Sequence, residues 1–134
     1  MTYAALYITT ADITDSVARD FISDSRVLIW MQRADEELGS LALTLGVPIE
    51  SIYTPVNSRV RDYVIANFCY LLFRDVNGEN EVENPGNEVH IVKMKQWKEV
   101  IDELRTLITK EQLLQVVTSL TPSQMVNVGV IWRG

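Results

Sequence analysis

Hydrophobic residues recur at steps of three and four positions along most of the chain, a spacing that indicates amphipathic helices. The clearest run, SRVLIWMQRADEELGSLALTLG, predicts one long helix over residues 25–46. Gly46 stands where a left-handed residue closes a helix, and Pro48 follows it. Gly39, inside the run, is expected to permit a close helix crossing. The apolar face of this helix is expected to consist of Val27, Trp30, Met31, Ala34, Leu38, Leu41 and Leu45.

A second apolar run predicts a long helix over residues 58–76, with Asn57 or Ser58 as its N-cap. The predicted helix stops at the Asn-Gly pair of residues 77–78. In its second half, from Ile65 onwards, apolar residues occur nearly all round the helix. Such a helix either lies at the centre of the fold or is covered on a second side by a partner.

The N-terminal part of the chain predicts a short helix over residues 9–21. Thr9 or Thr10 is its expected N-cap, and Thr9 has capping-box spacing to Asp12. Ile13, Val17 and either Ala18 or Phe21 would supply its apolar face.

The C-terminal half predicts another long helix, from about residue 88 to residue 108, with an apolar face that includes Trp97. Thr109 and Gln112 then repeat capping-box spacing and predict a short fifth helix, which Pro122 ends. The two-proline segment over residues 47–57 should pack on the body as a loop. The predicted fold class is therefore an all-α bundle of four to five helices in one domain, residues 1–120.

The chain ends in a different pattern. In QMVNVGVIWRG, apolar and polar positions alternate with the period of a β-strand, so residues 121–134 are predicted to form an extended tail. Two interpretations stand: the tail folds back on the chain's own helices, or it adds to a partner's sheet edge, which would pair its backbone groups. The residues predicted to dock a partner are Met125, Val126, Val128, Val130, Ile131, Trp132 and Arg133.

Composition agrees with one folded domain, because 47% of the 134 residues are apolar. The single cysteine excludes an internal disulfide and is typical of a reducing compartment. The N-terminal residues lack the pattern of a signal peptide, and no apolar stretch approaches the length of a membrane span. The net charge of −6, without a basic stripe, argues against tight nucleic-acid binding.

Candidate chemistry is sparse. His90 has no obvious metal-ligand partners, and Cys69 sits in the apolar run NFCYLLF, where a buried, unreactive thiol is expected. The consecutive acids Asp35, Glu36 and Glu37 fan around a helix and are interpreted as a solvated face. No phosphate-binding or nucleophile motif is present, so neither an enzyme nor a cofactor or metal site is expected.

A second acidic group lies in DVNGENEVENPGNE, residues 75–88, which holds two glycines, one proline and no basic residue. It is predicted to be a solvated loop. It lacks the spacing of a calcium-binding loop. Its acidic residues are Asp75, Glu79, Glu81, Glu83 and Glu88.

The segments YITTADI and SRVRDYVIANFCYLLFRD, together with the helix order, resemble the small helical head–tail connector (adaptor, or head-completion) proteins of tailed bacteriophages. The resemblance covers roughly residues 7–108. It implies a structural virion protein at the head–tail interface, made in the host cytoplasm, that assembles as a ring, usually dodecameric, beneath the portal. Such a ring extends the DNA channel and offers a platform to the next stopper or tail protein.

Applied to this chain, the resemblance assigns portal docking to the C-terminal tail. DNA would pass through the ring without specific binding, and the acidic residues 75–88 are expected near the lumen or the rim, where negative charge repels the DNA backbone. No membrane is involved.

Each subunit of a closed ring needs two different faces. The surplus apolar surface of helix 58–76, and the charges of Arg59 and Arg61 against those of Asp35, Glu36 and Glu37, are candidate contacts. Salt bridges within one subunit are the alternative for these charges. The competing hypothesis for the whole protein is an intracellular helical binding or regulatory module whose tail docks a protein partner.

Overall fold

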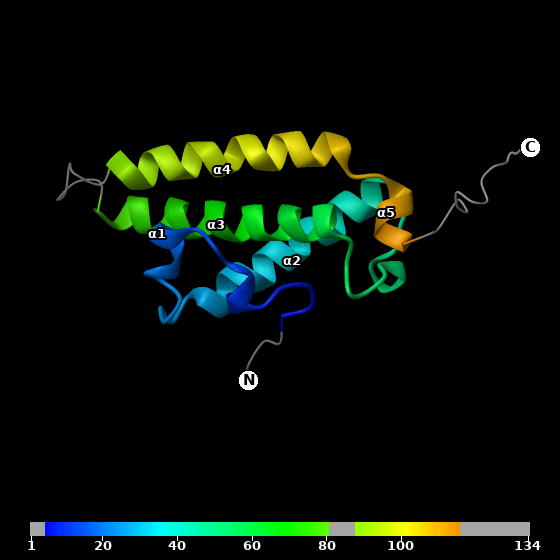
Figure 1. Ribbon diagram of the computed structural model, residues 1–134, viewed down its shortest axis with the longest axis horizontal. Helices are drawn as coiled ribbons and strands as arrows, with labels where there is room; N and C mark the ends of the chain where they lie inside the picture. The colour runs from blue at the N-terminus through cyan, green and yellow to red at the C-terminus, as the bar shows by residue number, and fades with distance from the viewer. Residues whose placement is uncertain (1–4, 81–87, 116–134) are drawn as a thin grey trace, which may run out of the picture.

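Three long helices form the body of the protein: α2 (Val27–Thr44), α3 (Ser58–Asn80) and α4 (Glu88–Leu107). The computed structural model describes residues 5–80 and 88–115, and this part of the chain is all-α, as predicted. Figure 1 shows α3 and α4 lying side by side and antiparallel, with α2 crossing α3 obliquely. The predicted extended tail lies outside the described residues.

Helix α2 confirms its predicted apolar face. Six of the seven residues expected there are buried, and Leu45 is partly buried. Gly46 has the predicted left-handed backbone, with φ of 82°. Gly39, however, faces Ile49 of the short helix η2 (Ile49–Ser51) and not another long helix, because a Cβ at Gly39 would lie 3.0 Å from the Ile49 Cδ1 atom.

Helix α3 is the centre of the fold. The Asn57 side chain caps it by accepting a hydrogen bond from the Arg59 backbone N–H at 2.8 Å. Most of the apolar surplus of its second half is buried against α2 and α4 of the same chain, while Ile65 and Tyr70 are only partly buried, and its role as a ring contact stays a prediction. Completely buried residues along α3 include Val60, Tyr63, Val64, Phe68, Cys69, Leu72 and Phe73.

The end of α3 also differs from the prediction, because the helix continues through the Asn-Gly pair to Asn80. Val76 is 1% exposed, and Asp75 accepts a hydrogen bond from the Trp30 indole of α2 at 2.8 Å. These tertiary contacts hold the last turns against a sequence of weak helix formers. Asp75 therefore belongs to a packed helix and not to a solvated loop.

The predicted N-terminal helix is split in two. Thr9 and Asp12 make the expected capping contact, but it opens only the 3₁₀ turn η1 (Thr10–Asp12). The chain is extended at Ile13, and Asp15 then caps a separate short helix, α1 (Ser16–Arg19), by accepting the backbone N–H groups of Val17 and Ala18. A second good capping residue within six positions ends one turn and starts another.

The two-proline segment and the short helix α5 agree with the sequence predictions. Val47, Ile52 and Val56 of the two-proline segment are buried, as expected for a packed loop, while Ile49 and Tyr53 remain exposed. The predicted capping box opens α5 (Lys110–Leu114), where the Thr109 hydroxyl accepts from the Gln112 backbone N–H at 3.3 Å. The Tyr53 backbone N–H donates to the Leu113 carbonyl at 2.9 Å and ties α5 to this loop.

Candidate functional site

Helix α4 is packed less completely than the other long helices, and the consequence is a hollow on each side of it. Ile101 is buried against α3, but Met94, Trp97, Val100 and Leu104 are only partly buried. An apolar stripe wider than its single covering helix leaves apolar surface at both margins. These margins form the floors of the two hollows.

The acidic hollow, as we name the first, has a volume of about 630 Å³. It lies between α3, α4 and the N-terminal segment. Its apolar floor includes Trp97 and Ile65, and three carboxylates against one arginine give its rim a negative charge. The lining residues are Asp12, Thr14, Arg61, Asp62, Ile65, Trp97, Val100, Glu103 and Leu104.

The basic groove, as we name the second, runs along the other margin of α4. It consists of two adjoining depressions of about 160 and 320 Å³, both lined by Tyr70 and Lys98. Its lining has four basic residues and two glutamates, and two of the basic residues pair with acids at the margin, Arg74 with Asp75 at 3.1 Å and Lys98 with Asp102 at 2.9 Å. The lining residues are Glu37, Asn67, Tyr70, Leu71, Arg74, Met94, Lys95, Lys98, Glu99, Ile101 and Arg105.

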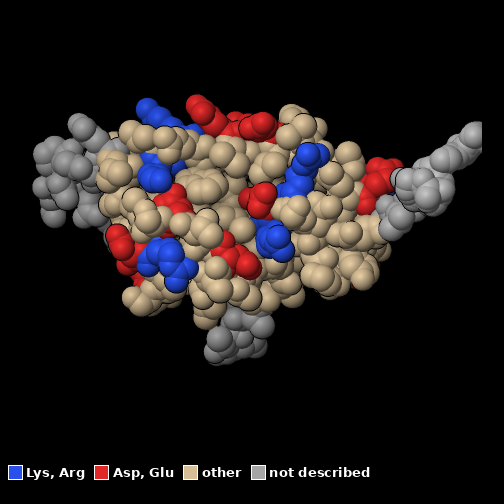
Figure 2. Space-filling model, viewed as in Figure 1, with Lys and Arg blue, Asp and Glu red and all other residues tan. Residues whose placement is uncertain are grey.

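The two hollows lie on opposite sides of the α3–α4 pair. Ile65 lines the acidic hollow and Arg74 the basic groove. These residues are nine positions apart, about two and a half helical turns, so they project from opposite sides of α3. Over the face drawn in Figure 2, acidic and basic side chains are interspersed, so this face as a whole does not carry charge of one sign.

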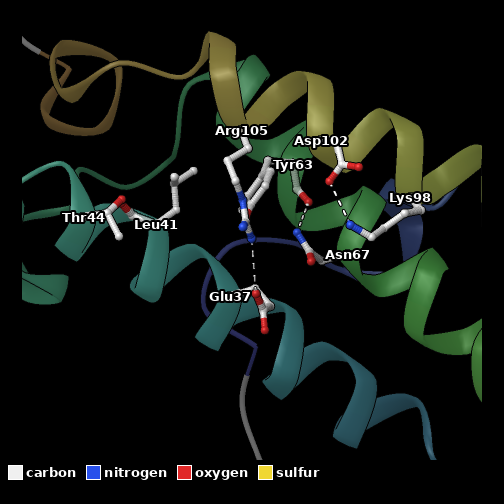
Figure 3. Close-up of polar contacts among 8 residues, drawn as sticks. All are labelled: Glu37, Leu41, Thr44, Tyr63, Asn67, Lys98, Asp102 and Arg105. Atoms are coloured by element: carbon white, nitrogen blue, oxygen red, sulfur yellow. Dashed lines mark hydrogen bonds and ion pairs between the residues drawn. The ribbon is translucent and has the colours of Figure 1, made fainter.

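Arg105 joins the three long helices beside the basic groove (Figure 3). Its guanidinium donates to the buried Tyr63 hydroxyl at 3.1 Å and lies 3.7 Å from the Glu37 carboxylate. Hydrogen bonding to Tyr63 is the main cause that raises the pKa of Arg105. Lys98 pairs along α4 with Asp102 at 2.9 Å, and both side chains are more than half exposed. Exposed pairs of this kind are weak and exchange partners readily.

Asp15 positions the aromatic floor of the acidic hollow. One of its carboxylate oxygens accepts from the Lys93 ammonium at 3.0 Å and from the Trp97 indole N–H at 3.1 Å. Only 4% of the Asp15 side chain is exposed. Burial raises the pKa of this carboxyl, but the hydrogen bonds from Ala18, Lys93 and Trp97 outweigh it and leave the pKa below its ordinary value. The sequence pattern gave no sign of this contact, which spans 82 positions.

The charged residues predicted as subunit contacts do not lie together. Arg61 lines the acidic hollow, Glu37 lines the basic groove, and the Arg59 guanidinium donates to the Leu107 carbonyl at 3.5 Å. Glu36 is exposed, as a solvated face requires. Asp35 is not, because it is 5% exposed and accepts the Leu6 backbone N–H at 3.0 Å.

The acidic residues predicted near the channel or rim, and the tail residues predicted to dock a partner, are only partly covered by the structure. Glu79 lies in the last turns of α3, and Glu88 begins α4. Glu81 and Glu83 lie outside the described residues, as do all the tail residues predicted to dock a partner. Their roles stay predictions.

The groups considered for chemistry sit in apolar surroundings. Cys69 is fully buried, and burial raises the pKa of its thiol to about 12, so it carries almost no thiolate at neutral pH. The His90 ring packs against those of Phe21 and Phe73, with centroids 5.7 and 5.8 Å away. Among residues 5–80 and 88–115, no group of three or more histidine, cysteine, aspartate or glutamate residues could hold a metal ion.

Comparisons of this chain with protein-family models, with curated proteins and with solved structures find no match. Within the part of the chain that the structure describes, no helix is both long and apolar enough to cross a membrane. The two hollows beside α4 have apolar floors and charged rims, an anatomy found in protein-binding surfaces.

Proposed function

We propose that this protein is a structural assembly subunit, namely a head–tail connector of a tailed bacteriophage that forms a ring below the portal. The observation that carries the proposal is the pair of different hollows on opposite sides of α3 and α4. A closed ring is built from heterologous contacts, in which each subunit offers two different faces. The resemblance in helix order adds the portal as the partner and virus assembly as the setting.

The arrangement suits a scaffold better than a catalyst. The Cys69 thiol is buried, and burial raises its pKa. The nearly buried Asp15 carboxylate already accepts hydrogen bonds from Lys93 and Trp97 of α4. Of the buried polar side chains, Asn67 donates to the Tyr63 carbonyl of its own helix and Asp35 accepts from the Leu6 backbone N–H, so both bond to the chain's own backbone. We therefore propose no enzymatic role.

The C-terminal tail is the proposed portal-docking element. A strand that pairs with a partner's sheet edge gains main-chain hydrogen bonds, and its alternate side chains select the partner. Trp132 and Arg133 are residue types enriched among those that dominate binding energy. The net charge of −6, multiplied around a ring, would keep DNA from adhering to the channel.

Light scattering tests this proposal with the full chain and with a chain ending at Pro122, each with and without the portal protein of the same virus. The full chain should join the portal in a complex of many copies, and the shortened chain should not. If neither chain binds the portal, the connector role is wrong, and the binding-module hypothesis replaces it.

A matched pair of substitutions tests the strand itself in the full chain. Val128→Asp places a charge on the apolar side of the alternation, whereas Asn127→Asp places the same charge on the polar side. We expect the first to abolish portal binding and the second to preserve it. Equal effects would contradict docking as a strand.

A further inference from the structure

We propose that the acidic hollow and the basic groove are the two halves of a head-to-tail contact between copies of this chain. The inference rests on the proposed function and deepens it, because it names the surfaces through which neighbouring subunits of the ring would meet. The basic rim of one copy would enter the acidic hollow of the next.

The charges favour this pairing over a symmetric one. Because the two hollows lie on opposite sides of the α3–α4 pair, a two-fold contact made through one hollow would set that hollow against its own copy. It would then bring Asp62 and Glu103 against their own copies, or Lys98 and Arg105 against theirs, and facing like charges are strongly unfavourable. Joining the acidic hollow to the basic groove instead sets opposite charges together. Repeated from copy to copy, such a contact makes a ring or a filament.

The side chains involved are available at low cost. Asp62, Glu103, Lys95 and Lys98 are all exposed. Lys98 is held only by its exposed partner Asp102 on the same helix. Breaking such a pair costs little, so a new partner from a neighbouring copy can replace it.

Shape and apolar content point the same way. The acidic hollow, at about 630 Å³, is larger than either depression of the basic groove and has room for long side chains from the groove of a neighbouring copy. Its floor offers Trp97 and Ile65, and the groove offers Tyr70 and Met94. Partly buried aromatic residues ringed by charges are typical of the energetic centres of protein interfaces.

Cross-linking between single-cysteine positions tests the contact directly on the full chain. The variants Glu103→Cys and Lys98→Cys each add one exposed thiol, while Cys69 stays buried. With a short bismaleimide, a mixture of the two variants should give a covalent dimer containing one copy of each. Either variant alone should give none, because positions 98 and 103 lie on opposite sides of α4.

Glu111→Cys, exposed on α5, mixed with Lys98→Cys is the control and should not cross-link. The absence of a mixed dimer from the Glu103→Cys and Lys98→Cys pair at millimolar protein would overturn the inference. So would dimers formed by one variant alone, because these indicate a symmetric contact.

Charge reversal gives a second, independent test by sedimentation, both free and with the portal. Asp62→Lys with Glu103→Lys makes both hollows basic, and Lys95→Glu with Lys98→Glu makes both acidic. Each double variant should associate with itself more than about tenfold more weakly than the wild type, and an equal mixture should regain association. Failure of the mixture to recover, with wild-type rings still formed on the portal, would refute this contact and leave the connector role standing. Cross-linking between copies without any portal binding would support this contact and refute the connector role.

Discussion

The Asp15 carboxylate accepts a hydrogen bond from the Trp97 indole at 3.1 Å and so fastens the N-terminal segment to α4. The same side chain caps α1 and pairs with Lys93 at 3.0 Å. One nearly buried carboxylate therefore bonds to both α1 and α4. It also fixes the ring of Trp97 at the floor of the acidic hollow, so the stability of the fold and the shape of this surface depend on one residue.

Replacing Asp15 by Asn should lower the free energy of unfolding by about 1–3 kcal/mol, because a charged acceptor is lost in a buried position. Urea unfolding at neutral pH measures this change. Asp20→Asn, on an exposed residue five positions later, is the matched control and should stay within about 0.5 kcal/mol of the wild type. An equal loss in both variants would contradict the role of Asp15.

The contribution of Asp15 should also depend on pH. Its pKa is lower in the folded protein than in the unfolded chain, so its stabilisation is present above the ordinary carboxyl pKa. This stabilisation is lost as the pH falls through the lowered value. The difference in stability between the wild type and Asp15→Asn should therefore shrink between about pH 5 and the acid limit of folding. A difference that is constant over this range would rule the linkage out.

The fold could be predicted from the sequence where the pattern was periodic. The apolar face of α2, its left-handed Gly46 and the cap at Asn57 all lie where the spacing placed them. The prediction failed where a second capping residue or a tertiary contact decided the outcome. Asp15 divides the N-terminal helix, and the Trp30–Asp75 hydrogen bond carries α3 past its Asn-Gly pair.

The candidate site could not be predicted in the same way, because each hollow is assembled from residues far apart in the chain. The acidic hollow joins Asp12 to Glu103, and the basic groove joins Glu37 to Arg105. The charges along one helix do not show which of its sides a neighbouring helix covers, so they do not show which charged residues will line the same hollow. A usable signal was the wide apolar stripe of α4, which exceeds what one neighbouring helix can bury.

Gly39→Ala should stabilise the protein by up to about 1 kcal/mol, because alanine is the better helix former inside α2. The added Cβ would lie 3.0 Å from Cδ1 and 3.2 Å from Cγ1 of Ile49, whose side chain is 48% exposed and has room to turn outwards. Thermal unfolding measures the change. Adding Ile49→Val, which removes the Cδ1 atom, should increase the gain. If Gly39→Ala destabilises the protein both alone and together with Ile49→Val, the Ile49 side chain cannot move away from the added Cβ, and the expected gain is contradicted.

Cys69 should be inert towards thiol reagents in the folded protein. It is fully buried, and its pKa of about 12 leaves almost no thiolate at pH 7. An aromatic disulfide reagent should therefore modify one thiol per chain in concentrated urea and none in buffer. In a Ser51→Cys variant the exposed new thiol should react at once while Cys69 stays silent. Rapid reaction of native Cys69 would show that α3 opens readily.

The acidic residues in the last turn of α3 and directly after it should act on DNA and not on assembly, if they lie near the channel of a ring. Replacing Glu79, Glu81 and Glu83 together by Gln removes three negative charges per copy and should leave ring formation on the portal unchanged. It should alter how firmly filled particles retain or release their DNA, because repulsion of the DNA backbone falls. Asp20→Asn with Glu50→Gln and Glu111→Gln removes the same charge from exposed positions elsewhere and is the control. DNA release that matches the wild type in the first variant would remove this segment from the channel, and equal changes in both variants would show that only net charge matters.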